Sequence, residues 1–343
     1  MRPAPRSIAV MGAGSWGTTF AKVLGDGGRA AGTTVRLWAR RTEVAEEVNR
    51  DHTNSAYLGE TVLPGNIVAG TDPAWVLDGA EIVVLAVPAQ TLREQLRSFR
   101  RHIPEGAVVV SLMKGLERGT DARMSEVVIE ELGLAPARVA VVSGPNLAME
   151  IAREEPTASV VACLDEDTAA WIAAAATPRY FRPYTNADVV GVELGGIVKN
   201  VIALAVGICD GRGMGDNTKA SVITRGLAET TRLTLALGGK VETMAGLAGL
   251  GDLVATCSSP LSRNRTAGRL LGEELTLEQV NQRMTQTAEG IKSGSAVLDL
   301  ARRHGVEMPI TQAVVDVLEG RLSVAGMGDR LLGRDLKSEG GNA

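Results

Sequence analysis

The sequence contains few cysteines. Only three occur among 343 residues, Cys163, Cys209 and Cys257, and they are far apart, odd in number and without CxxC spacing. A disulfide framework needs paired cysteines and a structural zinc site needs closely spaced ones, so we expect neither a disulfide nor a bound metal. The three thiols are expected to pack as small hydrophobic side chains.

The sequence also lacks the marks of membrane proteins and of nucleic-acid-binding proteins. No uninterrupted run reaches the roughly eighteen apolar residues of a membrane helix, and no apolar segment of signal-peptide length precedes Gly12. The formal net charge is -4, whereas bulk nucleic-acid binding depends on a basic field. With 45% hydrophobic and 22% charged residues, the composition is that of a soluble globular protein. We therefore expect a cytoplasmic protein that binds neither membrane nor nucleic acid.

Lysine is scarce, although positive charge is not. Of 36 basic residues only seven are lysine, which leaves 29 arginines. Lys199 is the only ionisable side chain between Glu193 and Asp210, in a segment whose length and aliphatic content favour a helix buried on nearly every face. Because burial can lower the pKa of a lysine, Lys199 is a candidate for proton exchange near neutral pH, with Asn200 beside it. The alternative is a lysine that reaches the surface or pairs with a carboxylate.

A glycine-rich turn follows the first predicted strand. The short apolar run Ser7–Met11 leads into a G-x-G-x-x-G formed by Gly12, Gly14 and Gly17, and a helical pattern follows from Thr18 to Leu24. In this context the glycines allow a tight turn and the close approach of a pyrophosphate, whose charge meets the helix N-terminus. The sequence therefore predicts a dinucleotide-binding turn.

The end of the second predicted strand bears on the choice of cofactor. The strand Thr34–Trp38 is followed by Arg40 and Arg41, where a fold specific for NAD would carry an acidic residue for the ribose hydroxyls. Arginine at this point suits a 2′-phosphate, so we expect NADP or NAD as the cofactor, with NADPH accepted. The alternative is a pair of solvated arginines.

The order of the predicted elements indicates two domains. Further strand patterns, separated by helical segments, lie at Ile82–Val87, Val108–Leu112, Val139–Val142, Ala158–Cys163 and Tyr180–Tyr184. Crossovers of this length are typical of an α/β Rossmann domain with a doubly wound, mostly parallel sheet, which we place at residues 1–187. From Asp188 onward the chain reads as consecutive helices, and we expect an all-α domain over residues 188–343.

The strand ends and one later loop carry the remaining candidate site residues. Ligands of doubly wound sheets lie beyond the carboxyl ends of the strands, where the sequence places Lys114, Gly144 and Asn146. In the helical part, the glycine-rich segment 246–265 is predicted to be a flexible loop that carries Asp252. It ends in Ser262-Arg263-Asn264-Arg265, which opens the next helix. This segment is read either as an anion site or as a solvated helix start.

These segments resemble the bacterial type of NAD(P)-dependent glycerol-3-phosphate dehydrogenase, and the resemblance covers almost the whole chain. It is carried by GAGSWGT at 12–18, VRLWARR at 35–41, KG at 114–115, SGPNLAME at 143–150, GVELGGIVKNVIALAVGICDG at 191–211, NTKASVITRGLAE at 217–229, GLGDLVATC at 249–257, SRNR at 262–265 and GVEMPIT at 305–311. The resemblance implies reduction of dihydroxyacetone phosphate to sn-glycerol 3-phosphate for phospholipid synthesis. It also implies a homodimer.

The resemblance also implies roles for single residues. Lys199 would be the proton acceptor, and the substrate would be faced by Lys114, Gly144, Asn146, Lys199, Asn200, Asp252, Ser262, Arg263 and Asn264. The dinucleotide would be approached by Gly12, Gly14, Ser15, Trp16, Gly17, Arg40, Arg41, Lys114, Ala148, Arg263 and Glu289. Asn146 stands where relatives often have Ser or Thr, and Thr287 where they often have an apolar residue.

The residues support a mechanism that agrees with this resemblance. Lys199, protonated in the direction of reduction, would hydrogen-bond the ketone oxygen and deliver a proton as the alkoxide develops, with Lys114 as a second positive group. Asp252 would orient Lys199. Two rival readings are a 6-phosphogluconate or β-hydroxyacid type of dehydrogenase and a dinucleotide-sensing protein without catalysis. The SRNR and GLGDL segments disfavour the first, and the combination of Lys114, Lys199 and Asp252 disfavours the second.

Overall fold

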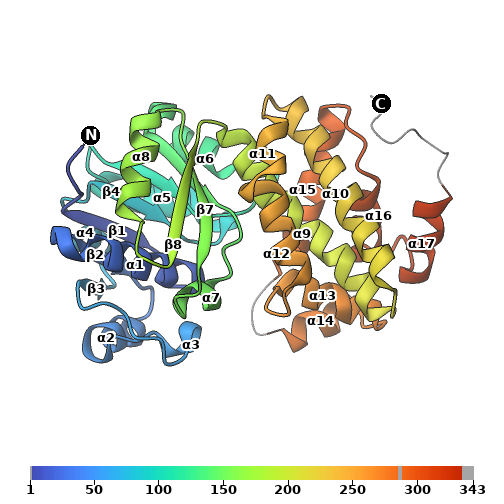
Figure 1. Ribbon diagram of the computed structural model, residues 1–343, viewed down its shortest axis with the longest axis horizontal. Coiled ribbons are helices and arrows are strands. Elements are labelled where there is room, and N and C mark those ends of the chain that lie inside the picture. The colour runs from blue at the N-terminus through green and yellow to red at the C-terminus, as the bar shows by residue number, and fades with distance from the viewer. Residues whose placement is uncertain (1, 285–287, 334–343) are drawn as a thin grey trace.

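The computed structural model describes residues 2–284 and 288–333 (Figure 1). Thr287 and the C-terminal tail lie outside the described residues. A domain built on a sheet occupies the N-terminal half of the chain, and a bundle of helices lies beside it (Figure 1). The predicted fold class, a doubly wound Rossmann domain followed by an all-α domain, is confirmed.

The sheet has eight strands in the order β3-β2-β1-β4-β5-β6-β7-β8. Their bounds are β1 Ser7–Met11, β2 Thr34–Trp38, β3 Ile67–Gly70, β4 Ile82–Leu85, β5 Val108–Ser111, β6 Val139–Ser143, β7 Thr157–Ala162 and β8 Phe181–Asn186. All neighbouring pairs are parallel except β6 and β7, which are antiparallel. The strand β3 was not predicted from the sequence.

Both faces of the sheet are covered by helices, which explains the continuous apolar runs in its central strands. One face packs against α1 Ser15–Gly28, α2 Thr42–Asp51, α3 Ser55–Leu58, α7 Ala148–Ala152 and α8 Glu166–Ala175. The other face packs against α4 Pro73–Leu77, α5 Leu92–Phe99 and α6 Met124–Leu132. Short 3-10 turns lie at Arg29–Ala31, Ala89–Thr91, Arg100–His102 and Pro136–Arg138. In β1, Ile8 faces the first layer and Ala9 the second, as the alternation of a strand requires.

The helical domain is built around α9 Val189–Gly211, which is buried along nearly its whole length. The other helices are α10 Asp216–Ala236, α11 Val241–Ala245, α12 Asp252–Ser258, α13 Arg263–Gly272, α14 Leu277–Arg283, α15 Glu289–Arg303, α16 Pro309–Leu318 and α17 Val324–Leu332, with a π-helical turn at Leu247–Gly251. The side chain of Asp188 caps α9 by accepting a hydrogen bond from the amide of Gly191 at 2.9 Å. The prediction of a helix buried on nearly every face is confirmed.

Helices α9 and α13 approach each other unusually closely, because glycines face each other at their contact. A Cβ atom on Gly207 would lie 2.1 Å from the carbonyl oxygen of Arg265, and one on Gly268 would lie 2.1 Å from that of Leu204. Neither position has room for a side chain. This contact fixes the start of α13 relative to the lysine that α9 carries.

A buried carboxylate joins the two domains. Glu193, on α9, accepts hydrogen bonds from the backbone amide of Ser125 at 2.9 Å and from the guanidinium of Arg123 at 2.6 Å, both at the start of α6. Leu116, which follows β5, belongs to the apolar core of the helical domain. The segment after β5, which begins near Lys114, is therefore packed against the helical domain.

Candidate active site

Two lysines from different domains share one carboxylate. The Nζ of Lys199, on α9, lies 2.6 Å from Oδ1 of Asp252, and the Nζ of Lys114, just beyond β5, lies 2.6 Å from Oδ2. The side chain of Asp252 is 1% exposed, and those of Lys199 and Lys114 are 9% and 12% exposed. Lys199 is therefore buried as predicted, and it also has the carboxylate partner that the alternative reading required.

Its buried position lowers the proton affinity of Lys114. Burial, helped by the nearby charge of Lys199, lowers its pKa to about 8, against the opposing pull of Asp252. Its Nζ also donates to the carbonyl oxygen of Gly144 at 3.0 Å. Lys114 therefore connects the candidate substrate residue Gly144 to the shared carboxylate, and it loses its charge as the pH rises through about 8.

Thr256 is a member of the site that the sequence analysis missed. Its hydroxyl accepts a hydrogen bond from the Nζ of Lys199 at 2.6 Å and lies 3.3 Å from Oδ1 of Asp252. Four residues separate Thr256 from Asp252, the spacing that places two side chains on one face of a helix. This spacing would have identified Thr256 had the segment been read as helical.

The segment predicted as a flexible loop, 246–265, is mostly helical, so that prediction is wrong. A π-helical turn at Leu247–Gly251 runs directly into α12, whose first residue is Asp252. The glycines serve close packing: a Cβ on Gly249 would lie 2.2 Å from the carbonyl oxygen of Met244. Asp252 is thus held by a rigid element, which suits a residue that must hold two cations at fixed distances.

Asn200 and Asn264 connect three helices beside the lysine pair. The side-chain amide of Asn264 donates to Oδ1 of Asn200 at 2.9 Å, and its oxygen accepts from the backbone amide of Gly290 at 2.9 Å. The amide of Asn200 lies 3.5 Å from Oε2 of Glu289, which is the first residue of α15. The predicted substrate residue Asn264 and the predicted cofactor residue Glu289 are therefore brought to the same place.

The start of α13 matches the prediction only in part. Ser262 caps the helix, and its hydroxyl accepts from the amide of Arg265 at 3.2 Å; Arg263 is exposed at the first helical position. The guanidinium of Arg265, however, lies 2.5 Å from a carboxylate oxygen of Asp210 on α9. Arg265 therefore has a structural partner, which contradicts its predicted use as a second cation of the anion site.

The glycine turn has the geometry that a pyrophosphate requires. Gly12 has φ +131°, and a Cβ there would lie 2.5 Å from the carbonyl oxygen of Ala86. A Cβ on Gly17 would lie 2.0 Å from the carbonyl oxygen of Gly12, whereas around Gly14 there is no atom within 4 Å of the Cβ position. The turn is thus closed toward the protein and open on one side, ahead of Ser15 at the start of α1.

Unpaired polar atoms mark the places where a ligand would bind. Both amide atoms of Asn146 and the indole nitrogen of Trp16 are buried without a hydrogen-bond partner among the described residues. Buried polar groups are rarely left unpaired, so these atoms fit a site that a dinucleotide and its substrate complete. Ala148 begins α7 next to Asn146, and its carbonyl oxygen accepts from the hydroxyl of Thr19 on α1.

Arg40 and Arg41 lie where the sequence placed them, beyond β2. Both are exposed, and Arg41 is the N-cap residue immediately before α2. The two residues after Ala39 are both arginines, so neither position has a carboxylate that could bind the ribose hydroxyls. Their position fits the 2′-phosphate hypothesis, and their exposure also fits the alternative of solvated arginines.

Three predictions of absence can be compared with the described residues. All three cysteines are buried, as predicted, and are free thiols; no metal-ligating cluster is found in the described ranges 2–284 and 288–333. Helix α9 is long and apolar enough to cross a membrane by length and composition, but 89% of its apolar window is buried inside the protein. Its apolar character is that of a core helix.

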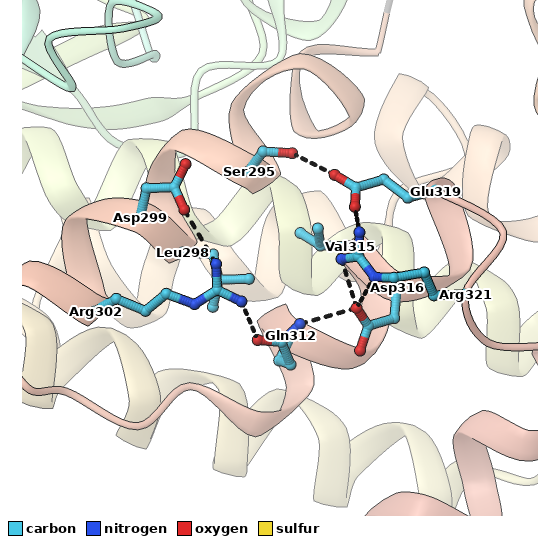
Figure 2. Close-up of a pocket in the computed structure, with 9 residues that line it drawn as sticks. All are labelled: Ser295, Leu298, Asp299, Arg302, Gln312, Val315, Asp316, Glu319 and Arg321. Carbon is cyan, nitrogen blue, oxygen red and sulfur yellow. Dashed lines mark hydrogen bonds and ion pairs between the residues drawn. The ribbon is translucent and has the colours of Figure 1, made fainter.

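A separate surface pocket between α15 and α16 is distinct from this site (Figure 2). It has a volume of about 270 Å³ and is lined by Ser295, Leu298, Asp299, Arg302, Gln312, Val315, Asp316, Glu319 and Arg321. Figure 2 shows that its charged groups pair with one another, as in the contact between Arg321 and Asp316 at 2.6 Å. None of its residues belongs to the predicted site.

Comparison with known proteins accounts for this arrangement. Residues 7–169 match the family model for the N-terminus of NAD-dependent glycerol-3-phosphate dehydrogenase, and residues 188–329 match that for its C-terminus. The chain is 56% identical over 336 residues to a glycerol-3-phosphate dehydrogenase (NAD(P)+) of Streptomyces griseus subsp. griseus, with 98% of each chain covered. It is 58% identical over 311 residues to that of Thermobifida fusca, with 91% of this chain and 92% of the relative covered.

Solved structures show the same relationship. The crystal structure of glycerol-3-phosphate dehydrogenase from Coxiella burnetii is similar with a TM-score of 0.89 and 38% sequence identity, and the match covers 96% of this chain and 99% of that one. The sequence and the fold thus point to the same family. The chain belongs to the family of NAD-dependent glycerol-3-phosphate dehydrogenases.

Proposed function

We propose that the chain catalyses the reversible, NAD(P)H-dependent reduction of dihydroxyacetone phosphate to sn-glycerol 3-phosphate. Membership of the family makes it an NAD(P)-dependent oxidoreductase, and its relatives carry that activity in their names. The observation that best supports the reaction is the shared carboxylate of Asp252, which holds two ammonium groups from two domains. Two adjacent cations suit a substrate that is anionic and develops further negative charge on an oxygen.

The dinucleotide would be held by residues of the sheet domain. The open side of the turn at Gly14 and the start of α1 at Ser15 and Trp16 would receive the pyrophosphate, with Arg40 and Arg41 near the adenosine ribose. The remaining cofactor residues would be Gly12, Gly17, Lys114, Ala148, Arg263 and Glu289. When bound, the reduced nicotinamide supplies the hydride.

Lys199 would serve as the proton donor in the direction of reduction. An ammonium group has three N–H donors, and its contacts with Asp252 and Thr256 take two of them. The third would be directed to the ketone oxygen and would pass its proton to the alkoxide as it forms. Asp252 would hold the ammonium group in position. Its negative charge would also offset part of the free-energy cost of burying the ammonium.

The substrate would be oriented by groups on both domains. Ser262, Arg263 and Asn264 at the start of α13 would hold its phosphate, and Asn264 is itself fixed by Asn200. Gly144, Asn146 and Lys114 would contact it from the sheet domain. A fixed phosphate holds the carbonyl carbon within reach of the hydride. This orientation of the reacting atoms is the main way in which binding of the phosphate would accelerate the reaction.

The experiment that tests this assignment is Lys199→Met, which keeps most of the side-chain volume and removes the amine. We expect the dissociation constant of NADPH to stay within about twofold and turnover with dihydroxyacetone phosphate to fall by about 10²- to 10⁴-fold, the usual contribution of a general acid. Lys22 provides a control, because like Lys199 it is a buried lysine that pairs with acidic side chains. Its partners are Asp26 and Glu154. Lys22→Met should lose stability and keep turnover within a few fold.

The substrate itself is tested by a panel. NADPH oxidation should be fast with dihydroxyacetone phosphate and slow with glyceraldehyde 3-phosphate and with 6-phosphogluconate. Activity mainly with the last compound would favour the rival dehydrogenase class, and none with any would favour a sensing protein. We further propose, from the family resemblance, a cytoplasmic homodimer that supplies glycerophospholipid synthesis, with its domains dividing between residues 187 and 188.

A further inference from the structure

Asn54 is a fully buried asparagine in the segment that joins α2 to α3, and these two helices lie at the edge of the sheet domain (Figure 1). Its side-chain amide donates to the carbonyl oxygen of Ala13 at 3.0 Å and contacts the hydroxyl of Thr18 at 2.9 Å. Ala13 lies inside the glycine turn and Thr18 in the first turn of α1. We propose that Asn54 is a positioning residue that holds the glycine turn in the conformation that receives the dinucleotide.

The side chain of Asn54 does not cap its own helix. Asn54 occupies the N-cap position of α3, where an asparagine usually accepts hydrogen bonds from the first amides of its own helix. No such bond is present, and the amide of Ser55 instead donates to Oε1 of Glu47 at 2.6 Å. The amide group of Asn54 is therefore available to the glycine turn, 41 residues earlier in the chain.

The two contacts hold the glycine turn at its middle and at the helix that follows it. The position of a Cβ on Gly14 has no atom within 4 Å, whereas Gly12 is packed against Ala86. Asn54 binds the carbonyl oxygen of the residue between these two glycines, and it also binds Thr18, whose own amide donates to the carbonyl oxygen of Gly14 at 2.9 Å. One side chain thus connects both ends of the turn.

Such a restraint matters because glycine-rich backbone is free to move in the absence of ligand. If the turn becomes ordered only when the dinucleotide binds, the entropy lost in ordering it weakens binding. A turn that is already ordered avoids this loss. The inference rests on the proposed dinucleotide site at this turn. It predicts that Asn54 affects cofactor affinity without contacting the cofactor and without affecting the proton-transfer residues.

Asn66 offers a closely matched control at the other end of α1. Its side-chain amide also donates two hydrogen bonds, to the carbonyl oxygens of Gly25 and Thr33, both at 2.9 Å. In both asparagines the side-chain oxygen is buried without a partner among the described residues. Asn54→Ala and Asn66→Ala therefore remove similar interactions from the same domain, but only the first removes them from the glycine turn.

The test compares the two variants by isothermal titration with NADPH, by thermal unfolding and by steady-state kinetics of the full chain. We expect Asn54→Ala to raise the dissociation constant of NADPH about tenfold, which corresponds to about 1.4 kcal/mol, with the KM for dihydroxyacetone phosphate at saturating NADPH within about twofold. Asn66→Ala should lower the melting temperature to a similar extent and leave the dissociation constant of NADPH within about twofold.

A milder variant keeps the inference testable if Asn54→Ala does not fold. Thr18→Val preserves the shape of its side chain, removes one of the two contacts of Asn54, and should raise the dissociation constant about threefold. Equal effects of Asn54→Ala and Asn66→Ala on NADPH binding, or no effect of Asn54→Ala or Thr18→Val, would overturn the assignment of Asn54. A wild-type chain that binds neither NADPH nor NADH would instead overturn the proposed function.

Discussion

The substitution Asp252→Asn tests most directly whether one carboxylate organises the active site. It keeps the shape of the side chain and removes its charge. Each carboxylate oxygen lies 2.6 Å from a lysine Nζ, and all three side chains are largely buried. In the variant, Lys114 and Lys199 would face each other without a counter-charge, and the amide nitrogen would be directed at one of the two ammonium groups.

The size of the effect follows from these distances. At 2.6 Å and an effective dielectric constant of about 20, each ion pair contributes an attraction of at most about 6 kcal/mol, and removing one partner of a buried pair typically costs about 3–5 kcal/mol. The attraction of Asp252 also raises the pKa of Lys114, which burial lowers to about 8. Without it, the pKa of Lys114 falls further, and the amine loses its charge at a lower pH than in the wild type.

The assay is the pH dependence of turnover with NADPH and dihydroxyacetone phosphate. In the wild type we expect activity to fall as the pH rises through about 8, because Lys114 loses its proton there. In Asp252→Asn this fall should move to lower pH, and turnover at neutral pH should decrease by about 10²- to 10³-fold, equivalent to about 2.7–4 kcal/mol.

Asp316→Asn is the matched control for this experiment. Asp316 also holds two cations, Arg321 at 2.6 Å and Arg330 at 2.5 Å, and its side chain is 6% exposed, but it lies in the pocket of Figure 2. Its substitution should reduce stability and leave turnover and its pH dependence unchanged. Turnover of Asp252→Asn within about fivefold of the wild type, with the fall still near pH 8, would refute the reasoning.

Four further substitutions and one control test other parts of the structure. Arg40→Ala and Arg41→Ala should raise the KM for NADPH more than that for NADH, because only NADPH carries a 2′-phosphate; equal changes would refute this assignment. Gly207→Ala places a Cβ 2.1 Å from a carbonyl oxygen of α13, so denaturant titration should show that the free energy of unfolding falls by about 3 kcal/mol. Steady-state kinetics should show a higher KM for dihydroxyacetone phosphate. Gly106→Ala, which has open space around it, should change neither quantity. Burial raises the pKa of Glu229 to about 7, above its ordinary value, so this group lowers the free energy of unfolding by up to about 3 kcal/mol as the pH rises from about 4.5 to 7. Glu229→Gln should flatten that dependence in urea titrations, and an unaltered slope would contradict the argument.

Local patterns predicted the elements on which function depends. The glycine turn was identified because three glycines at fixed spacing follow a strand and precede a helix, and this relation involves only neighbouring residues. The burial of Lys199 was predicted because α9 is apolar on nearly every face, which no surface helix can be. The strand β3 escaped prediction because it follows Pro64 and Gly65, its second residue Val68 is exposed and it ends at Gly70, so it lacks the continuous buried run of β4 and β5.

One feature that was not predicted and one wrong prediction have a different origin. The direction of β7 could not be predicted, because a strand buried on both faces has the same apolar run whichever way it points. The segment 246–265 was predicted to be a flexible loop because its glycines were read as flexible, whereas Gly249 provides the space for a close contact with Met244. In both cases the deciding contact is made with residues from another element.

By itself the sequence determined the order of the elements, the dinucleotide turn and the isolation of one lysine among apolar residues, because each depends on residues close together in the chain. Only the tertiary structure decided that Asp252 serves two lysines, one 53 and the other 138 positions away. It also decided that Thr256 joins them and that Arg265 is paired with Asp210. The physical reason is that such contacts depend on how α9, α12 and α13 pack and on how the two domains meet, which no local spacing specifies.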